Sequence, residues 1–320
     1  MMRPATWLLL VMLVALPLRA DEVPANGSAA SGSARDPQAL REIAPLWEWK
    51  DAELQAGLER SLDALGLAAP LAKGQLAVAL VDVTDINHPR VAAVNGDRMI
   101  YAASLPKIAI MLAVFEKMET GEIKLDDETW GQLNRMIRRS SNSDSTALMH
   151  KVGKPYIAEV LASPRYKLYD PERNGGLWAG KDYAKAGLWR RDPLHNLSHG
   201  ATTMQIARFY YLLETGRLTS PEASKQMKRL LADSAINHKF VKGMRTVRPS
   251  ARVYRKSGTW SAYHADGALI ERSDGATYIA AGLAKVAQGK TWFPQIIIAM
   301  DRLIPAPHAK GNGKTNSRRR

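Results

Sequence analysis

Short apolar runs rich in Val, Ile and Ala, which are typical of buried strands, lie near both ends of the chain. Four segments share this pattern: 76–85, 90–104, 251–260 and 264–285. In the last of them, Asp274-Gly275 separates two strand-like runs and predicts a β-hairpin. The strands of one sheet are therefore expected from two stretches that lie far apart in the sequence.

Between these stretches the apolar residues recur every three to four positions, as they do on helices with one buried face. A first helix is predicted over 45–67, a last one over 293–304, and a largely helical stretch runs from 105 to about 247. This order predicts an α/β fold with an antiparallel sheet flanked by helices. Both ends of the chain would form the sheet, and an all-helical domain would be inserted between them.

The first twenty residues differ from the rest of the chain. Arg3 is followed by an apolar run and then by Ala20, the order that is typical of a secretory signal peptide. The run is too short for a comfortable membrane span. We expect cleavage near Ala20 and export to the periplasm, with an uncleaved membrane anchor as the alternative. Residues 21–45 are small and polar and predict a linker.

The formal net charge of +14 raises the question of an anionic partner. Nucleic acid is not expected, because no basic motif interleaved with aromatic residues is present and an exported protein meets little nucleic acid. Part of the charge lies in 306–320, a basic tail without apolar periodicity that is predicted to be disordered. We expect weak attraction to anionic envelope polymers or lipid.

Composition also restricts the chemistry. The chain has no cysteine, so disulfides, thiolate metal sites and a cysteine nucleophile are excluded. The seven histidines show no metal-binding spacing. We therefore expect neither a metal nor a cofactor.

Ser104 and Lys107 stand three positions apart in an otherwise mostly apolar segment. Ser104 lies where a strand is predicted to end and a helix to begin, and residues three apart on a helix share a face. Burial would lower the pKa of Lys107 toward that of a general base, and the helix N-terminus offers N–H groups to an oxyanion. The alternative is a helix-capping Ser104 with Lys107 extending to solvent.

Two further polar motifs follow. Ser140-Ser141-Asn142 lies at a predicted helix–helix turn, where such residues are common anyway. Lys256-Ser257-Gly258-Thr259 lies inside a predicted strand, where glycine often marks the close approach of a ligand or another backbone. The alternative for Lys256 is an edge-strand lysine beside a bulge. In a shared pocket, its charge would lower the pKa of Lys107 further.

Ser-x-x-Lys, Ser-x-Asn and Lys-Ser-Gly in this order resemble the signature motifs of serine β-lactamases and penicillin-binding proteins, most closely those of class A β-lactamases. The resemblance covers about residues 46–304. It implies an α/β domain in two parts, 46–119 and 247–305. The helical domain between them, 120–246, would contain an omega-like loop at 163–200.

The resemblance also implies acyl transfer through a covalent acyl-enzyme. Ser104 would be the nucleophile and Lys107 its base or proton relay. Ser140 would pass a proton to the leaving nitrogen, and Asn142 would hold the side-chain amide of the substrate.

The third motif would bind the rest of the substrate. Lys256 and Ser257 would hold its carboxylate, with Gly258 next in the same strand. The N–H groups of Ser104 and Thr259 would form the oxyanion hole.

The chain departs from the class A pattern in its second motif. Ser141 stands where the family has an aspartate. A rival register, Ser143-Asp144-Ser145, keeps the aspartate but loses the asparagine, and the first register has the better spacing to Gly153.

A second departure concerns the omega-like loop, which lacks the Glu-x-x-Leu-Asn motif whose glutamate activates the deacylating water. Asp192, four residues before Asn196, is a candidate for this base, and Glu172 is a weaker one. If neither serves, the acyl-enzyme would be long-lived.

Three functional hypotheses follow. The first is an exported serine hydrolase of the class A β-lactamase type that hydrolyses β-lactam amides through an acyl-enzyme on Ser104. The second is a D-alanyl-D-alanine peptidase or peptidoglycan acyltransferase that acts on stem peptides with the same serine. The third is a catalytically silent envelope-binding protein. A monomer is expected in each case.

Overall fold

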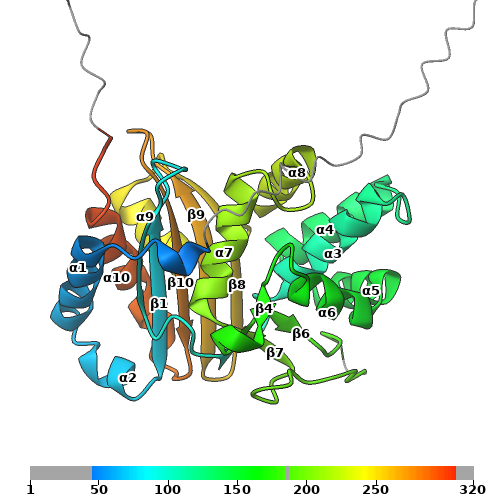
Figure 1. Cartoon of the computed structure of the whole chain (residues 1–320), viewed down its shortest axis with the longest axis horizontal. Helices are drawn as coiled ribbons and strands as arrows, with labels where there is room; N and C mark the ends of the chain where they lie inside the picture. The colour runs from blue at the N-terminus through cyan, green and yellow to red at the C-terminus, as the bar shows by residue number, and fades with distance from the viewer. Residues whose placement is uncertain (1–44, 185–186, 308–320) are drawn as a thin grey trace, which may run out of the picture. The chain divides into compact units, whose positions relative to one another are not determined.

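The computed structural model describes residues 45–184 and 187–307 (Figure 1). The predicted signal peptide, all but the last residue of the predicted linker and most of the basic tail lie outside the described residues. The described α-helices are α1 (Ala52–Ala64), α2 (Ala68–Ala72), α3 (Lys107–Glu119), α4 (Asp127–Arg138), α5 (Asn142–Val152), α6 (Lys154–Ala162), α7 (Thr203–Glu214), α8 (Pro221–Leu231), α9 (Phe240–Val247) and α10 (Gly289–Arg302).

The strands fall into a large sheet and several short pairings. They are β1 (Leu76–Asp82), β2 (Arg90–Val94), β3 (Ile100–Tyr101), β4 (Tyr169–Asp170), β5 (Gly175–Gly176), β6 (Trp178–Ala179), β7 (His199–Ala201), β8 (Arg252–Trp260), β9 (Tyr263–Glu271) and β10 (Thr277–Ala284). Two short 3-10 helices, η1 (Leu46–Glu48) and η2 (Pro171–Arg173), complete the described elements.

The large sheet joins the two ends of the chain. Its strand order is β2-β1-β10-β9-β8, and each pair of adjacent strands is antiparallel. β1 pairs with β10 over its full length, so the strands before and after the helical stretch lie side by side (Figure 1). This confirms the predicted antiparallel sheet of an α/β fold. The β9–β10 hairpin also turns at Asp274-Gly275 as predicted, with Gly275 at φ +90°.

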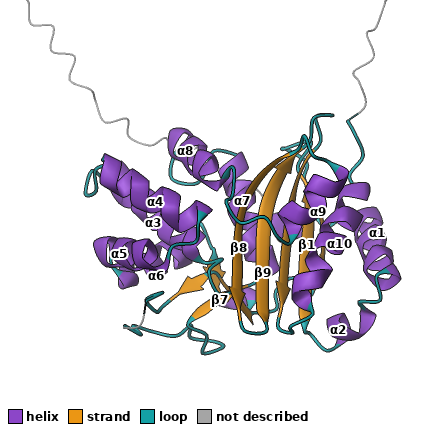
Figure 2. Cartoon of the chain, turned by 180° about the vertical axis from the view of Figure 1, so that it is seen from behind, coloured by secondary structure: helices purple, strands orange, loops and turns teal. Residues whose placement is uncertain are grey.

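Helices cover both faces of this sheet. Leu76, Val78 and Leu80 of β1 pack into a cluster with side chains of α1 and α10. The alternate residues of β1 pack into a second cluster with α3 and α7. The helices α3 to α6 gather beyond the β8 edge, whereas α1, α9 and α10 lie together on the other side (Figure 2).

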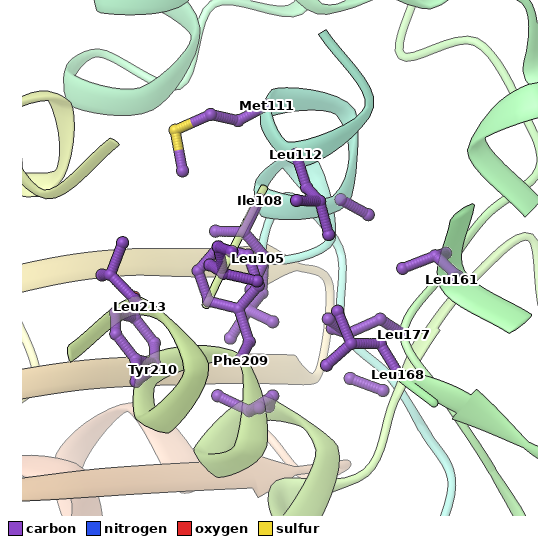
Figure 3. Close-up of a cluster of buried hydrophobic side chains, with 14 of the residues drawn as sticks. Leu105, Ile108, Met111, Leu112, Leu161, Leu168, Leu177, Phe209, Tyr210 and Leu213 are labelled. Carbon is purple, nitrogen blue, oxygen red and sulfur yellow. The ribbon is translucent and has the colours of Figure 1, made fainter. Parts of the chain in front are cut away.

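Helix α3 is buried along most of its length. All residues from 107 to 115 are buried, as expected for a helix that is apolar all round. Leu105, Ile108 and Leu112 lie in the same apolar cluster as Phe209 and Tyr210 of α7 (Figure 3). This packing fixes the helix whose first residue is Lys107.

The start of the described chain differs from the prediction of one helix over 45–67. The structure has the short η1 followed by α1, which begins only after Asp51. The Asp51 side chain accepts a hydrogen bond from the Leu54 N–H at 2.7 Å and caps α1. This cap decides the start of the helix, so Trp47 lies outside it although its spacing matched the helical pattern.

The stretch predicted as largely helical also contains strands. Short strands between 169 and 201 form the pair β4-β5 and, together with β3 from before the helical stretch, the sheet β3-β7-β6. Gly175 and Gly176 adopt φ values of +100° and +154°, which favour glycine and interrupt any helix. No described helix is long and apolar enough to cross a membrane.

Candidate active site

Ser104 lies in a tight turn between β3 and α3, as the sequence predicted. The Ala102 N–H donates to the His199 carbonyl at 3.0 Å, which ties the start of the turn to β7. Ala103 then adopts φ +51°, and the Lys107 N–H donates to the Ser104 carbonyl at 3.3 Å. Within the described ranges, the Ser104 N–H has no hydrogen-bond acceptor. It is therefore available to a ligand at the entrance of α3.

Gly258 brings the third motif against this turn. β8 is an edge strand of the large sheet. A Cβ atom on Gly258 would lie 2.0 Å from the Ala102 carbonyl oxygen and 2.8 Å from the Ser104 nitrogen. The strand can approach the turn at Ser104 this closely only because residue 258 has no side chain. The sequence predicted the close approach of a ligand or another backbone at Gly258, and here the backbone of Ala102 and Ser104 approaches it.

Lys107 is fully buried, with 0% of its surface exposed. Its Nζ donates to the Ser140 carbonyl at 2.7 Å and to Asn142 Oδ1 at 2.8 Å, with a longer contact of 3.3 Å to the Ser141 carbonyl. The ring of Tyr183 lies 4.4 Å from the same nitrogen. Lys107 therefore does not extend to solvent.

Burial lowers the pKa of Lys107 to about 7, although the charge of Asp144 opposes the shift. Desolvation penalises the ammonium, and none of the acceptors around Nζ is a carboxylate. The described residues show no hydrogen bond between Lys107 and the Ser104 hydroxyl, because the amine is directed toward 140–142. Such bonds are often long in unliganded enzymes and tighten with substrate.

Ser140 links the two lysines of the site. Its Oγ accepts from Lys256 Nζ at 3.0 Å and lies 3.4 Å from Lys107 Nζ. Ser140 has φ +59°, a left-handed conformation that turns the chain at this point. Lys256 is 2% exposed, and burial together with the charges of Lys107 and Arg255 lowers its pKa well below the usual value. The sequence predicted that the charge of Lys256 would lower the pKa of Lys107. In the structure, the charge of Lys107 lowers the pKa of Lys256.

The side chains of the rival register, Ser143-Asp144-Ser145, do not contact Lys107. Ser141 caps α5 by accepting from the Asp144 N–H at 3.3 Å, and Asp144 pairs with Arg135 at 2.7 Å. The Ser145 hydroxyl bonds to the Ser141 carbonyl. The structure therefore brings Ser140 and Asn142 to Lys107, and leaves the side chains of Ser143, Asp144 and Ser145 in other contacts.

Sequence analysis missed a third buried lysine. Lys239, at φ +54°, is 2% exposed. Its Nζ donates to the carbonyls of Gly258 and Ala265 and to Thr259 Oγ1, at 2.5, 3.0 and 2.9 Å. Burial lowers its pKa to about 7. No local motif surrounds Lys239 in the sequence, so only the folded chain shows that it holds the end of the third motif.

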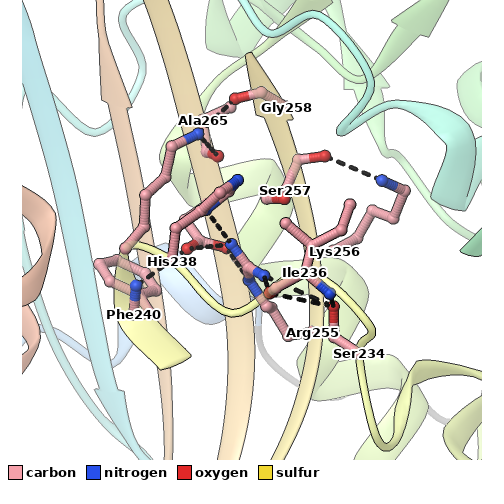
Figure 4. Close-up of polar contacts among 12 residues, drawn as sticks. Ser234, Ile236, His238, Phe240, Arg255, Lys256, Ser257, Gly258 and Ala265 are labelled. Carbon is pink, nitrogen blue, oxygen red and sulfur yellow. Dashed lines mark hydrogen bonds and ion pairs between the residues drawn. The ribbon is translucent and has the colours of Figure 1, made fainter. Parts of the chain in front are cut away.

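A buried ion pair joins β8, the strand that carries the third motif, to the neighbouring strand β9 (Figure 4). Arg255 and Asp266 are both inaccessible and pair at 2.7 Å across β8 and β9. Arg255 also donates to the Ile236 carbonyl at 2.5 Å, and Asp266 accepts from the Phe240 N–H at 3.1 Å. The pair therefore ties the segment before α9 to the strand that carries Lys256.

Asp192 is 2% exposed and lies in a network of donors. Its Oδ1 accepts from the N–H groups of Leu194 and His195, at 3.2 and 2.9 Å, and from the Tyr169 hydroxyl at 3.1 Å. Its Oδ2 accepts from the Leu197 N–H at 2.6 Å. Four donors occupy most lone-pair positions of a carboxylate, which leaves little room for a water. These contacts are those of a loop-forming residue, and a role as deacylating base stays a prediction.

The other candidates give little further chemistry. Glu172 is exposed on η2. In the part of the chain that the structure describes, no group of three His, Asp or Glu side chains could hold a metal ion.

Comparison with known proteins agrees with this geometry. The model of the beta-lactamase enzyme family matches residues 58–132 and 130–296. The beta-lactamase from Sphaerobacter thermophilus DSM 20745 is similar with a TM-score of 0.58 at 19% identity, over 76% of this chain and 95% of that chain. PBP-A has a TM-score of 0.60 at 14% identity, over 79% of this chain and 96% of that chain.

A variant of PBP-A, described as an acyl-enzyme complex with penicillin G, has a TM-score of 0.59 at 14% identity, over 79% of this chain and 96% of that chain. At these identities the solved structures show a shared fold alone. None of the curated proteins matches the chain.

Lys107 and Lys256 meet at the Ser140 hydroxyl, beside the turn that holds Ser104. Together with the fold, this arrangement defines a class of enzymes that use serine as the nucleophile. Because the family model extends over most of the described residues, the chain belongs to the beta-lactamase enzyme family. The protein is a serine hydrolase with β-lactamase-like function.

The lowered pKa of Lys107 can be measured directly. In protein labelled with ¹³C at the lysine Cε, we expect at least two lysines, Lys107 and Lys239, to titrate near pH 7, because burial disfavours their charged forms. Lys107→Arg should remove one of these titrations, and Lys239→Arg should remove the other. A protein in which no lysine titrates below about pH 9 would contradict the burial described for both side chains.

Proposed function

We propose that the protein opens β-lactam amide bonds by acylation of Ser104. The observation that carries this proposal is the meeting of Lys107 and Lys256 at the Ser140 hydroxyl, beside the turn that holds Ser104. The arrangement supplies a base, a proton path and positive charge at one point. Each of these is required for acyl transfer to a serine.

In the proposed acylation step, the Ser104 oxygen bonds to the amide carbon of the β-lactam and the carbon–nitrogen bond breaks. The neutral amine of Lys107 accepts the proton of the serine hydroxyl. Because the pKa of Lys107 is lowered to about 7, this neutral form is abundant at neutral pH. Ser140, in contact with both lysines, passes a proton to the leaving nitrogen. The single proton lost by Ser104 thus ends on the leaving nitrogen, and the products of this step are an ester on Ser104 and a neutral amine.

The same contacts favour a binding mode for the substrate. The Ser104 N–H, which has no acceptor among the described residues, and the N–H of Thr259 would bind the oxyanion. Gly258 lets the two segments approach each other. Lys256 and Ser257 would hold the substrate carboxylate. Because Asn142 accepts from Lys107 through Oδ1, its amide nitrogen is left to donate to the side-chain amide of the substrate.

The second candidate is a D-alanyl-D-alanine peptidase or peptidoglycan acyltransferase. The hydrogen bonding of Asp192 favours it, because four donors leave the carboxylate oxygens little room for a hydrolytic water. Slow removal of the acyl group would give a long-lived ester on Ser104. PBP-A, whose variant forms an acyl-enzyme with penicillin G, shares the fold of this chain.

The proposed setting is the periplasm. The order of charged, apolar and small residues in 1–20 supports export. The formal charge of +14 supports weak attraction to anionic polymers there. The proposed substrates, β-lactams or stem peptides, are also met in that compartment.

The proposal predicts a covalent adduct on Ser104. Intact-mass measurement after mixing with a penicillin should show the addition of one penicillin per chain, and Ser104→Ala should abolish it because the nucleophilic oxygen is lost. Rapid gain and loss of the adduct, with hydrolysed product, supports a β-lactamase. A persistent adduct supports the peptidase or acyltransferase.

The control for this measurement is Ser143→Ala, which removes a hydroxyl of the rival register and should leave the adduct unchanged. A folded wild-type protein that forms no serine-dependent adduct with any penicillin or D-alanyl-D-alanine ester would refute both enzymatic candidates. The third hypothesis, a catalytically silent envelope-binding protein, would then remain.

Asp192→Asn separates a structural role from a catalytic one. We expect the free energy of unfolding to fall by about 1–3 kcal/mol, because an amide oxygen cannot accept all four hydrogen bonds. The candidate role of Asp192 as deacylating base predicts that the adduct also persists about tenfold longer, at an unchanged acylation rate. Glu172→Gln provides a control with an exposed carboxyl. An unchanged lifetime of the adduct in Asp192→Asn would remove Asp192 from the mechanism and leave it a structural residue of the loop.

A further inference from the structure

A cleft of about 630 Å³, which we call the α8–α9 cleft, lies between α8, α9 and the first residues of β8. Its volume falls within the range of about 300–1,000 Å³ that is usual for ligand sites. Ser104, Lys107, Ser140 and Lys256, all of which the structure describes, do not line it. β8 begins at the cleft with Arg252 and reaches the third motif only further along the strand. The cleft is therefore separate from the candidate active site.

The side chains that line the α8–α9 cleft are strongly basic. Six of them are basic and two are acidic, whereas the whole chain has 45 Lys and Arg residues and 31 Asp and Glu residues. The cleft is thus more basic than the chain as a whole. Its acidic residues are Asp233 and Glu271, and its basic residues are Lys225, Lys228, Arg229, Arg245, Arg248 and Arg252.

Both acidic residues of the cleft are already paired. Glu271 pairs with Lys228 at 2.5 Å and with Arg252 at 2.7 Å. Asp233 pairs with Arg138 of α4, which does not line the cleft, at 3.7 Å. Since these partners compensate both carboxylates, the carboxylates do not neutralise the other four basic side chains.

Two of these four pair with carboxylates that do not line the cleft. Arg248 pairs with Asp301 at 2.9 Å, and Lys225 pairs with Glu222 at 3.7 Å. The side chains of Lys225 and Glu222 are 68% and 62% exposed, and ion pairs at such exposed positions contribute little to stability. Lys225 can therefore exchange Glu222 for another anion at little cost.

The remaining two, Arg229 of α8 and Arg245 of α9, are exposed and form no hydrogen bond or ion pair with any residue that the structure describes. Basic residues are common in the last turn of a helix, because they interact favourably with the helix dipole. Arg229 and Arg245 stand in such turns, yet neither donates to a described carbonyl oxygen at the end of its helix. Their guanidinium groups are available to a ligand from both helices.

The residue types of the cleft favour phosphate as the ligand. Four of the six basic side chains are arginines, whose planar guanidinium donates two parallel hydrogen bonds to phosphate oxygens. Lys225 and Arg229 are four residues apart on α8 and share one face of the helix. The buried side chains of Val241 and Met244 line the same cleft. Apolar groups beside an ion pair lower the local dielectric constant and strengthen the attraction.

We propose that the α8–α9 cleft binds a ligand that carries two or more phosphate groups. Lys225 and Arg229 contact one phosphate from α8, and Arg245 contacts another from α9. The site gives the general attraction of the chain to anions a defined place, and it does not depend on acylation of Ser104. Phosphate groups of this kind occur in soluble polyphosphates and in lipid headgroups, which are two sources of the same chemistry.

The test is the binding of tripolyphosphate to the full chain, measured by calorimetry. We expect binding in the cleft that weakens as salt is added, because salt screens exposed charges. The double variant Arg229→Gln/Arg245→Gln should raise the dissociation constant by at least about tenfold, since it removes charged hydrogen-bond donors. Because neither arginine has a partner in the described chain, thermal unfolding should show that this variant is as stable as the wild type.

The matched control is Arg60→Gln/Arg302→Gln, which removes the same charge outside the cleft. Arg60 and Arg302 are exposed on α1 and α10, and Arg302 stands in the last turn of its helix, as Arg229 and Arg245 do. This control should leave the dissociation constant nearly unchanged. No binding of tripolyphosphate, unchanged binding in the cleft variant, or an equal loss in both double variants would overturn the site.

A second measurement identifies the source of the phosphates. Vesicles of phosphatidylcholine and cardiolipin, a lipid with two phosphates, should displace bound tripolyphosphate if the ligand is a lipid headgroup. They should leave it bound if the ligand is a soluble phosphate compound. Acylation of Ser104 by a penicillin should proceed at the wild-type rate in the cleft variant. A failure of the cleft to bind tripolyphosphate is therefore distinct from a missing adduct on Ser104, which would refute the proposed function.

Discussion

The site depends on the burial of one amine without a carboxylate partner. Lys107 Nζ has no exposed surface, and its hydrogen-bond acceptors are carbonyl, hydroxyl and amide oxygens. Such oxygens satisfy the donors of an ammonium but do not neutralise its charge, so the neutral amine becomes accessible near pH 7. The apolar packing of α3 buries Lys107, and the left-handed turn at Ser140 brings the acceptors of its amine into place.

The surroundings of Lys107 make the pocket electropositive. Lys239, Arg255 and Lys256 are also buried, and Asp266, which pairs with Arg255, is the inaccessible carboxylate among them. The lysines are held by backbone carbonyls and hydroxyls. The charged forms of these buried amines are costly in the free protein, which lowers their pKa values. A substrate carboxylate or a developing oxyanion would favour the charged forms.

The sequence predicted those parts of the site that are encoded locally. Ser104 and Lys107 are one helical turn apart, and Gly258, a glycine inside a predicted strand, indicated the close approach of a ligand or another backbone. The antiparallel sheet followed from apolar runs at both ends of the chain, which β1 and β10 confirm. In each case the signal lies within a few residues of the feature that it predicts.

Other features could not be predicted because they arise from contacts between distant segments. Lys239 has an ordinary sequence context, and only the approach of β8 and β9 gives its amine three acceptors. The rings of His199, Trp260 and Tyr263 gather around Tyr101 from β7 and the β8–β9 hairpin, so they form no motif in the sequence. The break before α1 depended on the cap formed by Asp51, which outweighed an apolar pattern that continued through it.

The most direct test of this account is the pH dependence of the acylation rate of Ser104 by a penicillin. Because neutral Lys107 is the active form, the rate should rise about tenfold per pH unit below pH 7 and level off above it. Lys107→Arg, which keeps the positive charge but cannot lose its proton, should lower the plateau by about 10²- to 10⁴-fold. A rate that is flat from about pH 5 to 9, or a Lys107→Arg variant with the wild-type profile, would contradict the account.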